Sequence, residues 1–189
     1  PWGLVGTGEG VVVEGALEGD VLRVSRAVAP SAASSPPQRP VRGVLQVAVV
    51  AAKFSDVADE PYNYSYVHDV VFGPFPSVRD FWERSSNGAV KLRPFYVHPR
   101  WLDLGMSTAD YCGVSNINDR VRRVASRVVE RLYYDFGVVL PDGGYLIIIL
   151  NARPSCEGFA GYGTIRYWTF STPYGQRQFA VSWIFHYAN

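Results

Sequence analysis

The sequence predicts a mixed α/β fold, in which a twisted β-sheet is packed against helices, preceded by a short β-hairpin segment. Two apolar runs of strand length, residues 44–50 and 145–150, are typical of strands covered on both faces, as in a partly parallel sheet. Apolar residues recur at helical spacing across residues 116–136. The 18 glycines and 13 prolines indicate many turns and disfavour a helical bundle.

The N-terminal segment, residues 1–28, is predicted to be rich in β-structure. Residues 11–16 and 21–28 flank a Glu-Gly-Asp sequence, which is a hairpin signal. An isolated hairpin is marginally stable in water, so this segment needs further strands or a docking surface.

A linker is predicted at residues 29–42, where proline, alanine and serine dominate the composition. We expect this linker to be extended and without regular structure, because proline fixes part of the backbone and removes a hydrogen-bond donor. The α/β domain is then predicted over residues 43–189.

Within that domain, the order of elements is strand, helices, strand, helix and three strands. Ser77 and Asp80 have the S-x-x-D spacing of a helix start, and the following helix is predicted to end near Asn87. The other expected elements are a helix over residues 66–72, a strand over 89–97, the long helix over 116–136, and strands over 145–150, 158–165 and 179–185.

The composition of the 189 residues excludes several classes of protein. With 48% hydrophobic and 19% charged residues, the chain can bury a sizeable core and is unlike a disordered chain. A formal net charge of +1 predicts no nucleic-acid partner, and no apolar stretch approaches the roughly 18 residues of a membrane span. Because the chain begins at Pro1 without a basic and apolar leader, we expect a processed mature chain or an excerpt of a longer protein.

A search of the sequence for chemistry finds no catalytic, cofactor-binding or metal-ligating residue. The three histidines do not form an H-x-x-x-H pair, which would place two imidazoles on one helical face. His68 beside Asp69 predicts a surface pair, His98 before Pro99 predicts a turn residue, and His186 has no assigned role. No G-x-S-x-G nucleophile elbow is present.

Three further residues are candidates for covalent modification. Asn63 begins an N-x-S glycosylation sequon, a short pattern that also occurs by chance. Cys112 and Cys156 are the two cysteines, and the residues alone leave open whether they are a structural bridge or a redox pair.

Several segments, taken in order, resemble one family. Residues 44–56 resemble the first catalytic-domain strand of the gametolysin-like and immune-inhibitor-A-like zinc metallopeptidases, which usually reads V-L-V-I-L-V-x-F-x-D. Residues 72–88 are similar to the F-G…S-V-x-x-Y-Y-x-E-x-S-Y-G-K-L segment of that family. Residues 155–163 resemble its C-G-W-A-G-L-G segment, and residues 182–184 match its S-W-I. Residues 12–28 resemble the β-rich end of its pro-region, so the resemblance covers nearly the whole chain.

The resemblance implies the N-terminal half of a metzincin-like catalytic domain, with secretion to the extracellular space. It also implies a disulfide between Cys112 and Cys156, since the gametolysin-like branch tends to have a cysteine at the earlier position. In such folds the strand near residues 158–165 forms the rim of the cleft and pairs with extended substrate. The possible rim residues here are Gly158, Phe159, Ala160, Gly161, Tyr162 and Gly163.

The chain departs from the family at one decisive point. In the family, S-W-I is followed by a helix with H-E-x-x-H, whose histidines hold zinc and whose glutamate is the general base. This sequence reaches Asn189 before any such motif, so no zinc ligand or catalytic residue is carried over. We expect zinc only in a full-length family member, and neither catalytic zinc nor peptide cleavage in this chain alone.

The leading hypothesis is therefore the N-terminal portion of a secreted zinc metalloendopeptidase that cleaves extracellular-matrix, cell-wall or other extracellular proteins. The expected partners are an extracellular protein or glycoprotein, together with the missing C-terminal half or a partner chain. One alternative is a non-catalytic extracellular module that reuses the fold, so enzyme activity stays open. Another is a small carbohydrate- or protein-binding domain that uses Tyr162, Tyr167 and Trp168.

Overall fold

The computed structural model describes residues 12–18, 21–28, 42–158, 160–164 and 166–186. The chain divides into two compact units, Pro1–Pro40 and Val41–Asn189. Almost all of the predicted linker, residues 29–41, lies outside the described residues. None of the helices in the described ranges has the length and apolarity needed to cross a membrane.

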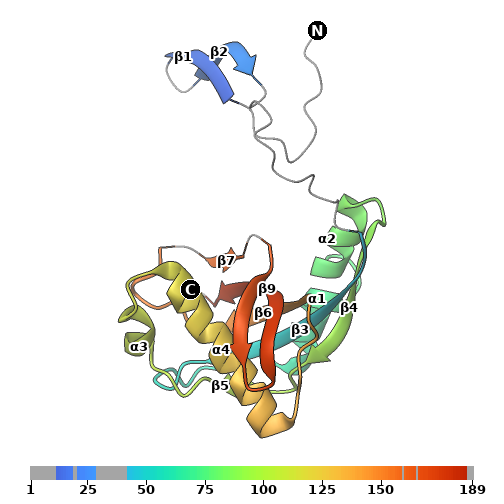
Figure 1. Ribbon diagram of the computed structural model, residues 1–189, viewed down its shortest axis with the longest axis vertical. Helices are drawn as coiled ribbons and strands as arrows, with labels where there is room; N and C mark the ends of the chain where they lie inside the picture. The colour runs from blue at the N-terminus through green and yellow to red at the C-terminus, as the bar shows by residue number, and fades with distance from the viewer. Residues whose placement is uncertain (1–11, 19–20, 29–41, 159, 165, 187–189) are drawn as a thin grey trace. The chain divides into compact units, whose positions relative to one another are not determined.

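The N-terminal unit contains the predicted hairpin (Figure 1). Strand β1 (Val12–Glu18) pairs with β2 (Val21–Val28) in antiparallel register, and an irregularity interrupts the register between Glu14 and Gly15. The prediction of two adjacent strands here is confirmed. Gly19 and Asp20, which belong to the predicted turn, lie outside the described residues.

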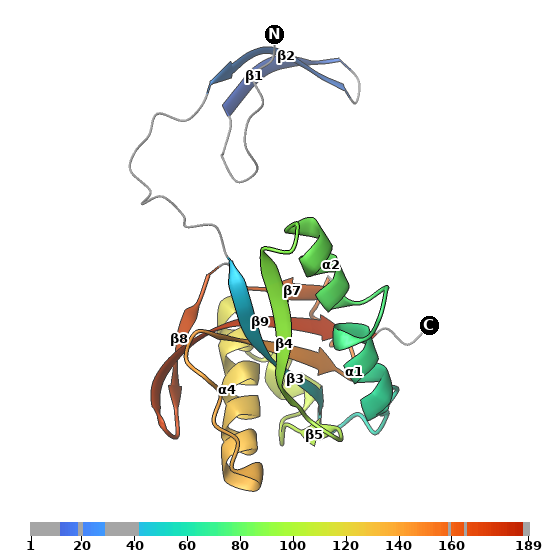
Figure 2. The same cartoon turned by 90° about the vertical axis from the view of Figure 1, so that its right-hand side faces the viewer.

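The second unit is a mixed α/β domain built on a seven-stranded sheet (Figure 2). Strands β4 (Val90–Val97), β3 (Gly43–Lys53), β6 (Gly144–Leu150) and β9 (Gly175–Phe185) run parallel, in that order. Strand β7 (Gly161–Gly163) lies antiparallel outside β9. Two further strands, β5 (Leu102–Asp103) and β8 (Trp168–Thr172), pair with β3 and β9, respectively.

Strand β3 separates two hydrophobic clusters, which explains its continuous apolar sequence. Because side chains alternate across a strand, successive residues of β3 enter opposite faces of the sheet. Ala48, Val50 and Ala52 pack in the larger cluster, whereas Val47, Val49 and Ala51 pack in the smaller one. The prediction of a strand covered on both faces is therefore confirmed.

Helix α4 (Ile117–Phe136) covers the larger cluster, and its ends are set by residues in the sequence. Asn116 caps its N-terminus by accepting a hydrogen bond from the backbone N–H of Asn118 at 2.8 Å. Gly137 ends it with φ 67°, a left-handed conformation that glycine adopts without strain. The helix buries one stripe at helical spacing: Val121, Val124, Ala125, Val128, Val129 and Leu132.

The smaller cluster is covered by α1 (Tyr64–Phe72), while α2 (Val78–Ser85) contacts α1 and β4 without a buried residue of its own. Ser77 caps α2 as the sequence predicts, since its hydroxyl accepts a hydrogen bond from the Asp80 N–H at 3.1 Å. Strand β4 forms one edge of the sheet. Pro94, which has no backbone N–H to donate, is compatible with this edge position.

Three elements were absent from the prediction: α3 (Thr108–Cys112), β5 and β8. Each of these elements is short and is stabilised by contacts with residues distant in the sequence. The local hydrophobic periodicity therefore gives little indication of them. The predicted strand over residues 158–165 is too long: among its described residues the strand is Gly161–Gly163, although the Ala160 carbonyl and the Thr164 N–H also hydrogen-bond to β9. Gly158 and Ala160 lie in the connection before β7.

Candidate functional site

Strand β7 presents backbone groups at an edge of the sheet. The Phe185 N–H donates to the Ala160 carbonyl at 2.9 Å, and the Thr164 N–H donates to the Val181 carbonyl at 2.8 Å. Since the hydrogen-bonding groups of successive strand residues point in opposite directions, Gly161 and Gly163 point their N–H and C=O groups away from β9. In the described ranges, no strand pairs with this outer side of β7.

The predicted rim residues are therefore divided between a loop and this short strand. Gly161, Tyr162 and Gly163 form β7, and Gly158 and Ala160 are exposed in the loop before it. Phe159 lies outside the described residues. The Tyr162 ring stacks on Trp183 with ring centroids 4.8 Å apart, which anchors the middle of the strand.

At Gly161 the backbones of β7 and β9 approach too closely for a side chain, whereas at Gly163 there is room for a Cβ atom. A Cβ atom at Gly161 would lie 2.7 Å from the backbone oxygen of Trp183, but one at Gly163 would lie 3.4 Å from the Ser182 hydroxyl.

We expect Gly161→Ala to lower the free energy of unfolding by about 1–3 kcal/mol because the backbone must shift. The matched Gly163→Ala variant should stay within about 0.5 kcal/mol of the parent in urea unfolding. Equal stability of the two variants would contradict the close approach.

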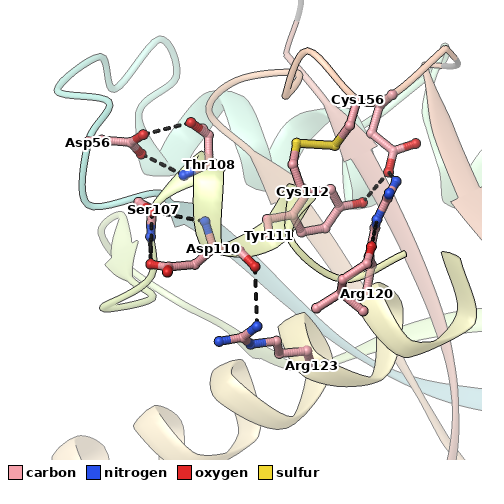
Figure 3. The surroundings of a disulfide bond; sticks show 11 residues. Asp56, Ser107, Thr108, Asp110, Tyr111, Cys112, Arg120, Arg123 and Cys156 are labelled. Atoms are coloured by element: carbon pink, nitrogen blue, oxygen red, sulfur yellow. Dashed lines mark hydrogen bonds and ion pairs between the residues drawn. A yellow bond between two sulfur atoms is a disulfide. The ribbon is translucent and has the colours of Figure 1, made fainter. Parts of the chain in front are cut away.

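The loop that leads into β7 is covalently attached to α3 (Figure 3). Cys112 and Cys156 form a disulfide, with an S–S distance of 2.07 Å and Cα atoms 5.7 Å apart. This is the pairing that the family resemblance implies. A structural disulfide is compatible with an extracellular protein.

A buried ion pair fixes the next residue of the same loop. The Glu157 side chain is 1% exposed, and its Oε1 lies 2.8 Å from Arg120 Nη1 of α4. The Tyr111 hydroxyl donates to the same oxygen at 2.8 Å. Burial raises the pKa of Tyr111 strongly, and its hydrogen bond to Glu157 raises it further. The Tyr111 phenol is therefore a neutral donor at physiological pH.

Helix α3 is itself held at its N-terminus. Ser107 and Asp110 form a capping box, and Asp56 accepts hydrogen bonds from the Thr108 N–H at 2.9 Å and the Thr108 hydroxyl at 2.6 Å (Figure 3). The hydrogen bond from the Thr108 hydroxyl is the largest cause of the lowered pKa of Asp56. These contacts, the disulfide and the ion pair together position the loop before β7.

A second candidate site is a cavity of about 340 Å³ beside the carboxyl ends of β3 and β4. Open α/β sheets commonly bind ligands outside the carboxyl ends of their strands. The cavity is lined by Ala51, Glu60, Tyr62, Asn63, Tyr64, Val67, His98, Pro99, Arg100 and Trp101.

His98 is buried in the structure, with 3% of its surface exposed, although the sequence predicted only a turn residue. Its Nδ1 lies 2.9 Å from the Tyr96 hydroxyl, and its ring meets Phe136 edge-on at 4.6 Å. Burial lowers the pKa of His98, and the positive charge of Arg100 lowers it further. The packing against Phe136 could not be read from the local sequence, because that residue is distant along the chain.

The other two histidines have separate partners. His68 pairs with Asp69 at 3.1 Å on the surface, as predicted. His186 Nδ1 lies 2.8 Å from the Tyr62 hydroxyl, a contact across 124 residues of sequence. The Nδ1 atoms of all three histidines thus lie beside different groups. Within the described part of the chain, no three His, Cys, Asp or Glu side chains gather to hold a metal ion, so these residues do not fit a zinc site.

Asn63, the predicted glycosylation site, is exposed and has a structural role. It caps α1, because its Oδ1 accepts a hydrogen bond from the Tyr66 N–H at 2.9 Å. The aromatic neighbours of Asn63 in the cavity, Tyr62 and Trp101, were missed by the sequence analysis. Besides the sequon at Asn63, the alternating tyrosines at positions 62, 64 and 66 are a local signal that marks this region.

No protein-family model matches the chain, and a search of curated proteins finds no match either.

Proposed function

We propose that this chain is the N-terminal portion of a secreted zinc metalloendopeptidase, with the zinc-binding helix encoded after Asn189. The outer edge of β7 carries this proposal. Gly161 and Gly163 point backbone donors and acceptors outward there, and an extended peptide can pair with such an edge as an added strand.

The positions of the family-like segments support the same proposal. Residues 44–56 contain most of β3, and residues 77–88 contain α2. The cysteine-containing segment leads into β7, and residues 182–184 lie on the β9 strand beside it. Three of these segments thus contribute strands to one sheet, and α2 contacts its edge strand β4. The last two segments form the proposed cleft rim.

This chain's own part in the reaction is to bind and orient substrate. The fixed loop at Cys156 and Glu157 holds the start of β7, so the strand loses little freedom when a peptide pairs with it. The described residues do not form a zinc site, and we assign bond cleavage to none of them.

The first test is the reading frame that follows Asn189 in the natural transcript. We expect an H-E-x-x-H motif within about 20 residues. The extended protein should cleave peptides in a chelator-sensitive manner, whereas the verified 189-residue protein should neither cleave them nor contain stoichiometric zinc. A stop codon directly after Asn189, or a frame without the motif, would overturn the peptidase proposal and favour a non-catalytic module.

The second test examines the substrate-binding role of β7 in the extended protein. Gly163→Pro removes one outward N–H group, so we expect kcat/KM to fall about tenfold, as for the loss of one hydrogen bond. Gly163→Ala keeps that N–H and should change kcat/KM less than about twofold. Equal activity of the two variants would argue against peptide pairing at this edge.

A further inference from the structure

The cavity beside α1 combines aromatic rings with hydrogen-bonding groups, and the proposed peptidase function uses neither. Three of its lining residues are aromatic: Tyr62, Tyr64 and Trp101. Four others are polar or charged: Glu60, Asn63, His98 and Arg100. Its volume of about 340 Å³ falls at the lower end of the range for small-molecule sites.

The aromatic rings of the cavity are ordered by contacts within the protein. The Trp101 indole N–H donates to the Tyr62 carbonyl at 2.8 Å, and the Tyr62 hydroxyl lies 2.8 Å from His186. Tyr62 stacks against Tyr66 at a centroid distance of 4.7 Å and lies nearly parallel to Trp101 at 6.4 Å. A ligand that binds to these rings therefore loses little affinity to ordering of side chains.

The charges around the cavity are balanced. Glu60 and Arg100 have opposite signs, and Lys53 hydrogen-bonds to Glu60 just outside the lining. This hydrogen bond is the largest cause of the raised pKa of Lys53, and the charge of Asp103 adds to it. Because burial lowers the pKa of His98, that side chain is neutral at physiological pH. Charges of both signs therefore lie around this cavity, unlike the clusters of like charge that favour phosphate or a divalent cation.

Two lining residues retain hydrogen-bonding capacity. Among the described residues, Arg100 has no hydrogen-bond partner in the protein, and Asn63 uses only its oxygen for the α1 cap. A ring compound that has apolar C–H faces and hydroxyl edges suits this combination of aromatic faces and free donors.

We propose that this cavity binds a ring of a neutral saccharide. Aromatic faces contact the C–H side of the sugar, while Arg100, Asn63 and Glu60 bond its hydroxyl groups. The saccharide has two possible sources. Asn63 begins a glycosylation sequon at the cavity, so an attached glycan would start there; alternatively, the sugar belongs to a partner glycoprotein. This proposal is independent of the peptidase function.

The binding test uses the unglycosylated 189-residue protein and four sugars: N-acetylglucosamine, galactose, mannose and arabinose. Each sugar is added to about 10 mM, and the NMR signal of the Trp101 indole N–H reports binding. We expect at least one sugar to shift this signal. Tyr64→Ala and Arg100→Gln should each weaken its binding about fivefold or more. Tyr134→Ala removes a tyrosine that is 72% exposed on α4 and should leave binding unchanged.

A lack of response to all four sugars would overturn the proposal. Binding that is unchanged by Tyr64→Ala and Arg100→Gln would also overturn it, as would displacement of the sugar by equimolar inorganic phosphate. None of these results bears on the zinc motif or on β7, so failure of this proposal is distinguishable from failure of the proposed function.

The source of the sugar is tested by expression in a eukaryotic secretory host. Ser65→Ala destroys the sequon but keeps Asn63 as the cap of α1. A parent protein that loses mass with N-glycosidase and does not bind added sugar, while Ser65→Ala does bind it, would support an attached glycan as the occupant. An unmodified parent that binds sugar directly would support a partner glycan. Binding by neither protein would overturn the saccharide site.

Discussion

Replacement of Arg120 by alanine is expected to lower the free energy of unfolding by about 3–5 kcal/mol, because it leaves a buried carboxylate without its partner. The Glu157 side chain is 1% exposed, and Arg120 is 12% exposed, so water cannot readily replace the guanidinium. The Tyr111 hydroxyl would still donate to Glu157, but one neutral hydrogen bond does not compensate for a buried charge. Urea unfolding followed by circular dichroism measures the loss.

Two control variants make this prediction specific. Arg127→Ala removes an arginine from an exposed pair with Glu130 and should cost less than about 1 kcal/mol. The double variant Arg120→Ala/Glu157→Gln removes the unpaired charge and should recover part of the lost stability. A double variant less stable than Arg120→Ala alone would show that loss of packing, and not the buried charge, dominates.

Removal of the disulfide is the second change with a large expected effect. Cys112 and Cys156 are separated by 44 positions, and opening a loop of that size costs about 4 kcal/mol in the chain-entropy model, less any relieved strain. The Cys112→Ala/Cys156→Ala variant should therefore unfold at a markedly lower urea concentration. The comparison should be made with the oxidised parent under non-reducing conditions.

Alkylation provides an independent check of the same bond. Native, non-reduced protein should contain no reactive thiol, and two thiols should appear after reduction and unfolding. Detection of two free thiols beforehand would contradict the disulfide. Because Cys156 adjoins Glu157, the double-alanine and Arg120→Ala variants should be non-additive when combined.

The main elements of the α/β domain could be predicted from the sequence because their signals are local. The apolar run of β3 reflects burial on both faces, and the stripe of α4 reflects burial on one. Ser77 and Asn116 mark helix starts through hydrogen bonds to residues only two or three positions away.

The cavity and the short elements could not be predicted, because they depend on contacts between distant residues. Tyr62 meets His186 across 124 positions, and Trp101 donates to the Tyr62 carbonyl across 39. The local hydrophobic periodicity of the sequence does not predict contacts of this kind. The predicted strand over residues 158–165 was also longer than β7. Gly158 and Ala160 lie before the strand, and nothing in the local sequence separates them from the residues within it.

The difference between the two edges of the sheet bears on self-association. On β4, Pro94 lacks a donor and the exposed Lys91 and Arg93 carry like charges, which together discourage pairing with another strand. Strand β7 contains neither a proline nor a charged residue, and only its three-residue length limits pairing with another strand. Two copies that joined through β7 would bury that edge and leave the protected β4 edges at the two ends of the main strand order. A single copy therefore resists strand addition at β4, while its β7 edge stays free to bind an extended chain.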